Sequence, residues 1–473
     1  MPSDEGAGTT PPGPSFSTTV RVEAVPGPAL LVDLTRLVGD TGATVVGVDL
    51  VEMASGSARV DVTFHAIDRH HVDRVVEAIN SAGHHVRRVS DRAYLYHLGG
   101  TIDVVAKSEI RTRDDLSLAY TPAVGRIASS IAAEPAAAWN LTIKANAVAI
   151  VTDGTAVLGL GDLGPLAALP VMEGKAALFR RFGEVNAFPL CLDVDGADAL
   201  VEVVTALAPT FGGVNLEDIA APRCFEVERR LQERLDIPVF HDDQHGTAAV
   251  VLAALLNASR MTGRELRHLR AVVVGIGAAG HAICDILLAA GVEDLVAVDR
   301  DGVLRPGPGL PVHQAELLPR LNPRGVRTLS EALVGADALV AVSRRGAIEP
   351  AEVAAMADRP IVFGLANPEP EIWPDEAPAG AVVATGRSDL PNQVNNALCF
   401  PGVFRGALDG RATRITPAML TAAATALADT VSEEERQLGV LIPSIFHPRV
   451  HERVAAAVRG AIDDADRRTA PPR

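Results

Sequence analysis

Acidic residues occur in pairs at two places in the sequence, each time directly after a short apolar run. Glu217 and Asp218 follow the run PTFGGVNL, and Asp242 and Asp243 follow IPVFH. Short buried strands have this pattern, and in α/β folds ligands collect at the carboxyl ends of strands. Carboxylates that meet at one point repel one another unless a cation lies between them, and their hard oxygen atoms favour Mg²⁺ or Mn²⁺. The spacing therefore predicts a divalent metal site, with helix caps and exposed loop acids as the structural alternative.

A glycine-rich segment lies further along the chain, at residues 275–280, between the apolar run AVVV and the helical pattern HAICDILLAAG. In this strand–turn–helix context, Gly275 permits a tight turn, Gly277 lets the backbone approach a pyrophosphate, and Gly280 permits close packing of helix and strand. The N-terminus of the helix then faces the phosphates. The predicted dinucleotide-binding residues are Gly275, Gly277, Ala278, Ala279, Gly280 and Asp299.

Asp299 bears on which dinucleotide is bound. It lies 19 positions beyond Gly280, at the end of the next apolar run, LVAVD. A carboxylate there accepts hydrogen bonds from the adenosine ribose and repels a 2′-phosphate, so it favours NAD. Arg300 and Arg305 lie close by in sequence and could reach a phosphate. NADP therefore stays open as the alternative.

Two further side chains are candidates for moving protons. Lys175 stands at the start of a predicted apolar helix, KAALFRRFG, and Tyr120 stands at a predicted turn before a helical stretch. A buried lysine near a cation loses its proton more readily and can act as a base. Taken alone, Lys175 has a solvated helix position as its structural alternative.

The elements that must position these side chains are those of an α/β protein. From about residue 97, glycine, proline and short apolar runs alternate with helical patterns, as in α/β enzymes. We expect a substrate- and metal-binding α/β domain over residues 97–255. A Rossmann-type dinucleotide-binding domain is expected over 256–412, followed by a helical segment over 413–473.

The N-terminal region has a different pattern. Residues 1–15 are rich in Pro, Gly, Ser and Thr and are expected to form a disordered tail. Over residues 16–96, strands and helices are predicted in the order βαββαβ, at 17–23, 28–41, 44–53, 58–65, 69–81 and 86–96. This order is that of an α+β ferredoxin-like domain. With VPGPALLVDLTRLVGDTGA after the first strand, it resembles the ACT family of small-molecule sensor domains; a module that only aids oligomerisation is the alternative.

Composition narrows the possible partners. The chain has 473 residues, 48% of them apolar and 22% charged, as in a soluble protein of two or three domains. Its formal net charge of −16 argues against nucleic acid or an anionic membrane surface as the main partner. No signal peptide and no run of 18 apolar residues without charge is seen in the sequence, so the cytoplasm is expected.

Seven segments of the chain, in order, resemble malic enzymes of the smaller, bacterial type. They cover roughly residues 97 to 450 and are LSLAYTP, VTDGTAVLGLGDLGPLAALPVMEGKAALF, PTFGGVNLEDIAAPRCFE, IPVFHDDQHGTAAV, VVVGIGAAG, GLANPEPEI and NNALCFPG. The match as a whole is highly specific, although each motif alone is not. It implies oxidative decarboxylation of L-malate to pyruvate and CO₂, with reduction of NAD or NADP and with Mg²⁺ or Mn²⁺ as the metal.

The resemblance implies three catalytic roles. Tyr120 of the YTP motif is the general acid, Lys175 of the EGK motif is the general base, and Asp242 tunes the proton affinity of the lysine. The metal chelates the C2 hydroxyl and C1 carboxylate of malate. Lys175 then removes the hydroxyl proton as hydride passes to the nicotinamide, and Tyr120 protonates C3 after CO₂ is lost.

Binding roles follow from the same resemblance. It assigns the metal to Glu217, Asp218 and Asp243, and substrate contacts to Asn367 and Asn395. Asn367 is expected to lie at the cofactor as well. Malate is thus the expected small-molecule partner, in a homodimer or higher homo-oligomer, with a small-molecule effector at the ACT-like domain.

The sequence departs from the family pattern in two places, and two other functions stay open. The YTP motif is usually followed by Gly-Val-Ala, but here residues 123–125 read Ala-Val-Gly. Ala156 stands where larger members of the family carry an arginine that grips a malate carboxylate, so the group that binds the C4 carboxylate is unassigned. The alternatives are a malolactic-type conversion of malate to lactate and a non-catalytic metabolite sensor.

Overall fold

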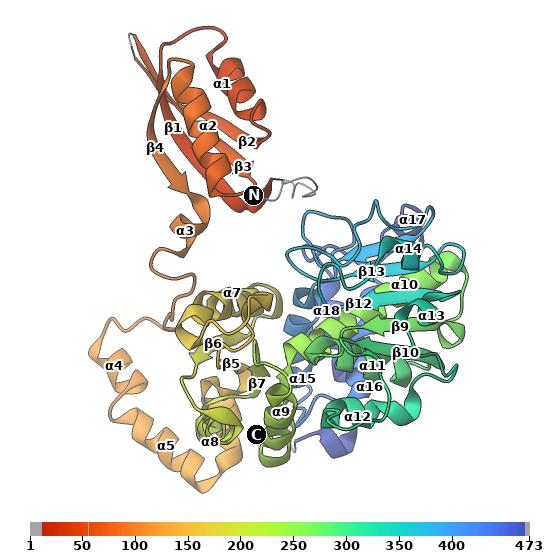
Figure 1. Cartoon of the computed structure of the whole chain (residues 1–473). Coiled ribbons are helices and arrows are strands. Elements are labelled where there is room, and N and C mark those ends of the chain that lie inside the picture. The colour runs from red at the N-terminus through yellow and green to blue at the C-terminus, as the bar shows by residue number, and fades with distance from the viewer. Residues whose placement is uncertain (1–11, 55, 469–473) are drawn as a thin grey trace. The chain divides into compact units, whose positions relative to one another are not determined.

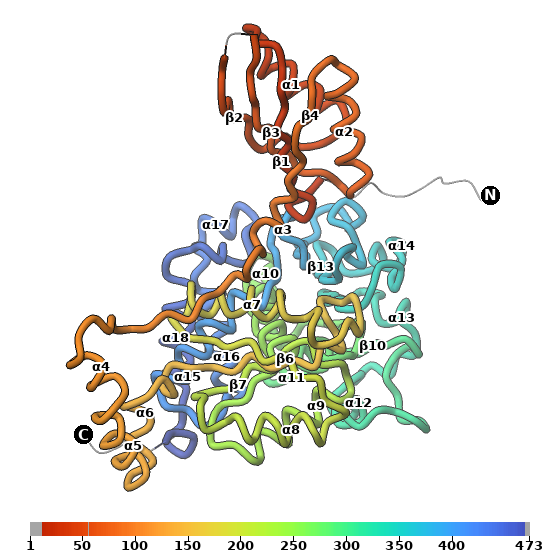
Figure 2. Tube along the Cα trace, turned by 90° about the vertical axis from the view of Figure 1, so that its left-hand side faces the viewer, coloured from red at the N-terminus to blue at the C-terminus, as the bar shows by residue number. Residues whose placement is uncertain are grey.

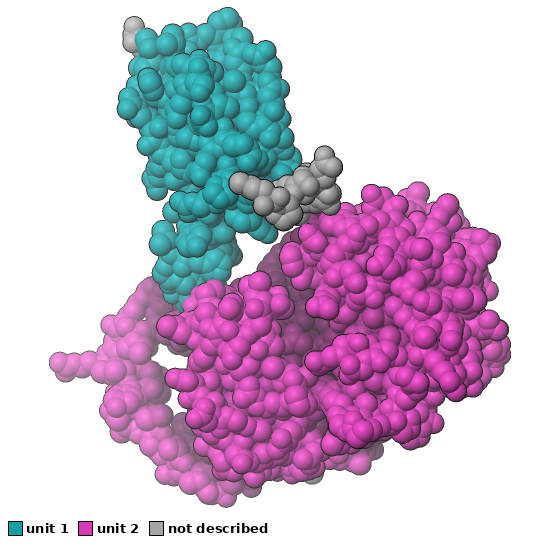
Figure 3. All heavy atoms as spheres, in the orientation of Figure 1, with its two compact units in different colours: residues 1–103 teal, residues 104–473 magenta. Residues whose placement is uncertain are grey.

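The computed structural model describes residues 12–54 and 56–468 of the chain. The chain divides into two compact units, residues 1–103 and residues 104–473, which Figure 3 shows in different colours. Each unit has a hydrophobic core of its own.

The first unit is an antiparallel sheet with two helices that share its core (Figure 1). Its main elements are β1 (Gly13–Ala24), α1 (Leu30–Gly39), β2 (Thr44–Ala54), β3 (Ser57–Ala66), α2 (Arg69–Ser81) and β4 (His85–Asp91). The strands pair in the order β2-β3-β1-β4. Leu34 and Val38 are one turn apart on α1, as Val75 and Ile79 are on α2, so both pairs face the sheet. The element order is the predicted βαββαβ, whereas the likeness to small-molecule sensor domains stays a prediction.

The ends of this unit differ from the sequence-based expectation. The last strand stops at Asp91 and not near residue 96, because the Asp91 carboxylate accepts hydrogen bonds from the backbone of Ala93 and Tyr94 and starts helix α3 (Arg92–His97). At the other end, Gly13 pairs with Ala66 of β3, so residues 13–15 belong to β1 and not to the expected disordered tail. Residues 1–11 of that expected tail lie outside the described residues.

The second unit begins with an extended segment, residues 104–146, which we call the arm. Its helices are α4 (Arg113–Ala119), α5 (Ala123–Ala133) and α6 (Ala138–Leu141), and none of them buries a side chain. Both views place α4 and α5 at the edge of the unit, away from its sheets (Figures 1 and 2). Among the described residues, none buries the apolar side of α5, which is unusual for an amphipathic helix.

A parallel sheet with strand order β6-β5-β7-β8 follows the arm. Its strands are β5 (Ala147–Thr152), β6 (Asn186–Cys191), β7 (Gly213–Leu216) and β8 (Val239–His241). The helices that alternate with them are α7 (Pro165–Gly183), α8 (Gly196–Leu207) and α9 (Arg223–Arg234). Every residue of β5, β7 and β8 is buried, and these strands are accordingly composed mostly of apolar residues.

Helix α10 (Thr247–Thr262) connects this sheet to the next. The domain boundary expected between residues 255 and 256 falls inside α10. The helix continues unbroken there because its apolar residues are buried on all sides. Among the described residues, no helix combines the length and apolar character needed to cross a membrane.

The second sheet has the strand order β11-β10-β9-β12-β13-β14. Its strands are β9 (Arg270–Val274), β10 (Asp294–Asp299), β11 (Gly302–Val303), β12 (Ala338–Ala341), β13 (Ile361–Gly364) and β14 (Val382–Thr385). All except β11 run parallel. The chain moves from β9 to β10 on one side and later to β12 on the other, so the carboxyl end of β9 is a topological switch point of the Rossmann type.

The remaining helices surround this sheet or close the chain. Beside it lie α11 (Ala278–Ala289), α12 (Val312–Leu317), α13 (Leu329–Leu333) and α14 (Pro350–Val353). The C-terminal helices are α15 (Phe400–Asp409), α16 (Pro417–Ala428), α17 (Glu433–Gln437) and α18 (Val450–Gly460).

Candidate active site

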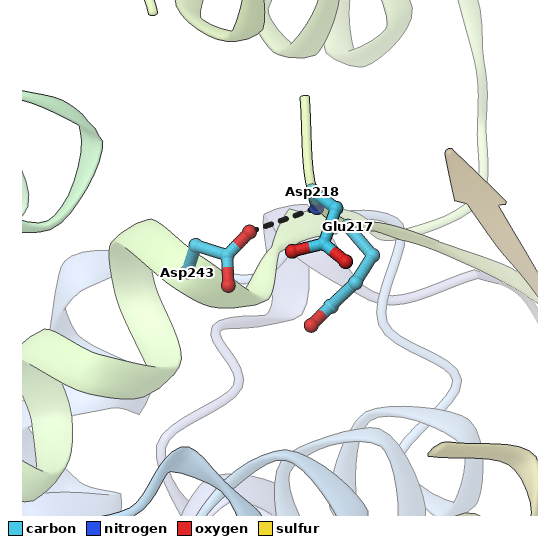
Figure 4. A group of neighbouring side chains, drawn as sticks. All are labelled: Glu217, Asp218 and Asp243. Atoms are coloured by element: carbon cyan, nitrogen blue, oxygen red, sulfur yellow. Dashed lines mark hydrogen bonds between the residues drawn. The ribbon is translucent and has the colours of Figure 1, made fainter. Parts of the chain in front are cut away.

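Three carboxylates meet at the carboxyl ends of β7 and β8 (Figure 4). Glu217 and Asp218 follow β7, Asp243 follows β8, and one oxygen of each lies within 4.8 Å of the others. The backbone N–H of Asp218 donates to Oδ2 of Asp243 over 2.9 Å. Oδ2 of Asp218 is buried and has no hydrogen-bond partner among the residues that the structure describes. An oxygen donor set with a buried, unpartnered oxygen fits a divalent cation.

The electrostatics of this cluster fit the same ion. Burial raises the pKa of Glu217 well above its usual value, and the neighbouring acids raise it further, against the opposing charge of Lys175. Burial and the charge of Asp243 raise the pKa of Asp218 to about 7. Charge is therefore unfavourable at this point of the fold unless a cation compensates it.

Lys175 lies against the carboxylate cluster. Its Nζ donates to Oε1 of Glu217 and to Oδ2 of Asp242, and it lies 4.5 Å from the ring centre of Phe400. The sequence predicted that Lys175 stands at the start of a helix, but the residue lies in the middle of α7. The helix begins ten residues earlier at Pro165, since proline is favoured at the first helical position.

Burial and neighbouring charges have opposite effects on the pKa of Lys175. Burial lowers the pKa of Lys175, but the charges of Asp242, Glu217 and Asp243 outweigh burial and hold it above its usual value. For Asp242, burial raises the pKa to about 6 against the lowering effect of Lys175. The amine is therefore held as the shared partner of two buried carboxylates.

A cleft of about 1030 Å³ joins the cluster to the second sheet. Its lining includes residues from both sheets of the unit, among them Lys175, Asp218, Asp243, Ala278, Asn367 and Asn395. The Oδ1 atom of Asn395 accepts a hydrogen bond from the backbone of Ala397 over 2.9 Å. Ala156 lies on the cleft wall as well, where it offers only a methyl group to a substrate. The structure thus brings together the predicted base, metal ligands and amide side chains.

The glycine-rich loop at the carboxyl end of β9 has the geometry of a phosphate-binding turn. Gly275 has a φ of +91°, and a Cβ there would lie 2.6 Å from the carbonyl oxygen of Val342. A Cβ at Gly280 would collide with the carbonyl oxygen of Gly275, whereas one at Gly277 would meet nothing within 4 Å. Helix α11 starts directly after Gly277. The open space at Gly277 and the helix N-terminus are what a pyrophosphate requires.

Asp299 occupies the end of β10, as predicted, and Gln314 holds its side chain. The side-chain nitrogen of Gln314 donates to Oδ2 of Asp299 over 2.7 Å and to the carbonyl oxygen of Ile276 over 3.2 Å. Gln314 therefore connects the acidic end of β10 to the glycine-rich loop. Sequence reasoning missed it, because no motif marks a glutamine 15 positions beyond the aspartate. Arg305 lines a small cavity together with Asp299, so two of the three charged residues expected to affect cofactor choice lie near each other.

Tyr120 is the predicted catalytic residue that the structure does not bring to the cleft. It follows α4 on the arm, is 65% exposed, and is not among the described residues that line the cleft. The unusual residue order after Thr121 and Pro122 does not prevent a helix, since α5 starts at Ala123.

Comparisons with known proteins agree with this architecture. The family model for the malic enzyme N-terminal domain matches residues 99–197 and 194–232, and the model for the malic enzyme NAD-binding domain matches residues 244–307 and 372–462. An NAD-dependent malic enzyme of Geobacillus stearothermophilus is 48% identical over 452 residues, which cover 95% of each chain. A bifunctional malic/malolactic enzyme of Bacillus subtilis is 50% identical over 76% of this chain and 90% of its own.

Solved structures show the same relationship. The crystal structure of a malic enzyme from Pyrococcus horikoshii has a TM-score of 0.76 and 46% identity, covering 80% of this chain and 92% of its own. An NAD-dependent malic enzyme from Thermotoga maritima gives a TM-score of 0.75 at 44% identity, covering 79% of this chain and 100% of its own. With family models, a full-length relative and solved structures in agreement, the chain belongs to the malic enzyme family.

Proposed function

We propose that this chain catalyses the oxidative decarboxylation of L-malate to pyruvate and CO₂, with reduction of NAD and dependence on Mg²⁺ or Mn²⁺. The observation that carries the proposal is the meeting of three features in one cleft. These are the carboxylate cluster, a buried lysine bonded to it, and the N-terminus of α11 beside the glycine-rich loop.

Glu217, Asp218 and Asp243 would hold the metal ion. A divalent cation at this place would supply positive charge that polarises the C2 hydroxyl of malate and favours the loss of CO₂. The cluster supports this assignment because Glu217 and Asp218 are each 4% exposed while their pKa values are raised.

Lys175 accepts the proton of the C2 hydroxyl in this proposal. Its bonds to Glu217 and Asp242 fix the amine at the edge of the cleft, where a substrate bound to the carboxylate cluster would place its hydroxyl. Positive charge bound by Glu217 would lower the pKa of the lysine and free its lone pair for this step. Asp242, fully buried, stays as the partner that keeps the amine in place.

Asn367 and Asn395 are proposed to contact the substrate. Both line the cleft, and amide donors suit the carboxylates of malate. Because Oδ1 of Asn395 already accepts from Ala397, its side-chain nitrogen is the group left to donate to the substrate.

NAD is proposed as the cofactor in preference to NADP. Gln314 binds one carboxylate oxygen of Asp299 and leaves the other for the ribose hydroxyls. A fixed carboxylate at this place would repel a 2′-phosphate. Arg305, on the wall of the same cavity, is the group that would favour NADP.

Tyr120 is proposed to act as the general acid in the cleft of a second copy of the chain. The arm exposes a series of large apolar side chains, among them Val104, Val105, Ile110, Leu116, Leu118 and Ile127. An apolar surface of this extent marks a protein interface, and a symmetric dimer would exchange the two arms. The proposal therefore includes a homodimer in which each cleft is completed by its partner.

The test is an assay of purified protein with malate and Mn²⁺, in which NADH absorbance and pyruvate are followed together. Equal yields of NADH and pyruvate are expected, with no turnover in a chelator and less with NADP. Lactate should be measured as a second possible product. The reason is that the bifunctional malic/malolactic enzyme of Bacillus subtilis matches three quarters of this chain. Lactate without NADH would replace the proposal with a malolactic reaction. Malate binding without any turnover would indicate a metabolite sensor.

The N-terminal unit is proposed to respond to a small-molecule effector and so to control the enzyme. This proposal rests on the βαββαβ order of the elements and on the finding that residues 1–103 form a compact unit of their own. Deletion of residues 1–95 is expected to leave an active enzyme whose response to effectors is lost. A change in oligomer size alone would show that the unit serves only assembly.

A further inference from the structure

Glu228 is a buried carboxylate that no step of the proposed reaction uses. It lies in α9 and is 6% exposed. It does not line the active-site cleft. Together with Gln244 and His245 it lines a separate cavity of about 560 Å³. Glu228 therefore reaches the turn after β8 from a side other than the one that faces the cleft.

The contacts of Glu228 converge on this turn. Oε1 accepts from the backbone N–H of His241 over 3.0 Å, and Oε2 accepts from the side-chain nitrogen of Gln244 over 3.2 Å. Nε2 of His245 lies 2.9 Å from Oε1 and 3.0 Å from Oε2. A fourth donor, Gln232, comes from the same helix as Glu228. One carboxylate thus binds the residues on both sides of Asp242 and Asp243.

The turn itself needs such support. Residues 242–246 form a single π-helical turn, a rare conformation that proteins use mostly at functional sites. It is tight, because Oδ1 of Asp242 fills the space that a Cβ at Gly246 would need. The strand before it, β8, has only three residues, so the sheet alone fixes little of its geometry.

We propose that Glu228 is a positioning residue for the metal site, holding the π-helical turn so that Asp243 faces the cation and Asp242 faces Lys175. This inference rests on the proposed function, since it assumes that Asp243 is a metal ligand. A hydrogen-bonded partner behind a ligating carboxylate orients that ligand and raises its affinity for the metal. Glu228 acts one step further back, through the backbone and side chains of the turn.

The carboxylate form is essential to this role. All four of its neighbours are donors, and a carboxylate is purely an acceptor. A glutamine at this position would keep the size of the side chain but would present its own N–H groups to at least one donor. Glu228→Gln should therefore loosen the turn without opening a cavity.

The test is the binding of Mn²⁺ alone to the full chain, measured from the electron paramagnetic resonance signal of free Mn²⁺. Glu228→Gln is expected to raise the Kd for Mn²⁺ by about tenfold to a hundredfold. Glu226→Gln is the matched control, because Glu226 lies in the same helix, is exposed and pairs only with Arg230 among the described residues. It is expected to bind Mn²⁺ like the unaltered chain.

A second variant covers the case that Glu228→Gln does not fold. Gln244→Leu removes one donor to Glu228 and is expected to raise the Kd about threefold, in keeping with the loss of one hydrogen bond. The inference is overturned if the folded Glu228→Gln chain binds Mn²⁺ as tightly as the unaltered chain. If Glu228→Gln does not fold, the same result with a folded Gln244→Leu chain overturns it. Asp243→Asn separates the two proposals: if it too binds Mn²⁺ normally, the proposed metal site is wrong and the inference falls with it.

Discussion

The two residues proposed to move protons lie in contrasting parts of the molecule. Lys175 is 7% exposed, within a helix packed on a parallel sheet, and two buried carboxylates fix its amine. Tyr120 is 65% exposed, on an arm whose helices bury no side chain. In the proposed mechanism, folding of a single chain brings together the base and the metal ligands. The general acid would reach the cleft only when two chains associate.

Removal of the base should have the largest effect. Lys175→Ala is expected to lower kcat for malate oxidation by about two to four powers of ten, the usual effect of losing a general base. The measurement is steady-state NADH formation at saturating malate and Mn²⁺. Arg180→Ala, an exposed change in the same helix, is the control and should keep full activity. Turnover of the Lys175→Ala chain near that of the control would remove the lysine from the mechanism.

Removal of the acid should have a smaller effect and can reveal which chain supplies it. Tyr120→Phe is expected to lower kcat about a hundredfold. When equal amounts of the Tyr120→Phe and Lys175→Ala chains are dissociated and reassociated together, half of the dimers are mixed. In a mixed dimer with exchanged arms, one of the two clefts has both native residues. Activity should then recover to about a quarter of that of the unaltered enzyme.

The same mixing experiment has a clear opposite outcome. If Tyr120 served the cleft of its own chain, every cleft in every dimer would carry one altered residue. Activity of the mixture would then stay at the level of the two separate variants. Tyr120 would in that case need a movement of the arm within one chain, and the contrast between folding and association would not hold.

The metal side should show its own dependence on pH. Burial and Asp243 raise the pKa of Asp218 to about 7, so this carboxyl group takes up a proton as the pH falls through 7. Binding of Mn²⁺ must displace that proton, so the affinity should fall about tenfold from pH 8 to pH 6 and change little above pH 8. Calorimetric titration with Mn²⁺ measures this. An affinity that stays constant from pH 6 to pH 8 would contradict the raised pKa.

How far the sequence predicted this architecture depended on how local each feature is. The carboxylates and glycines are fixed by strand ends and turns a few residues long, so apolar runs next to Glu217, Asp243 and Gly275 were enough to place them. Lys175 was expected at a helix start, but α7 begins ten residues earlier and accepts Pro170 in its interior.

Features that depend on contacts distant in sequence were not predictable in this way. Gln314 reaches Asp299 only because α12 packs beside α11, and Glu228 reaches its turn only because α9 packs beside β8. The exposure of Tyr120 was equally hidden, because an apolar helical pattern does not say whether its own chain or another covers it. The polarity pattern of a sequence predicts which face of a helix or strand is buried, but not which other segment covers that face.

A change at the proposed cofactor site should have the smallest effect on catalysis, and it should affect only the binding of the dinucleotide. Gln314 orients Asp299 through one hydrogen bond of 2.7 Å. Gln314→Leu is expected to raise the KM for NAD about threefold to tenfold, the worth of one such bond. The kcat and the KM for malate should not change, since the carboxylate cluster and Lys175 are untouched. Because Asp299 would then be free to turn away, the preference for NAD over NADP should narrow. Measurement of the KM for NAD and for NADP decides this. An equal rise in both KM values would mean that Gln314 supports only the glycine-rich loop, through Ile276, and not the recognition of the ribose.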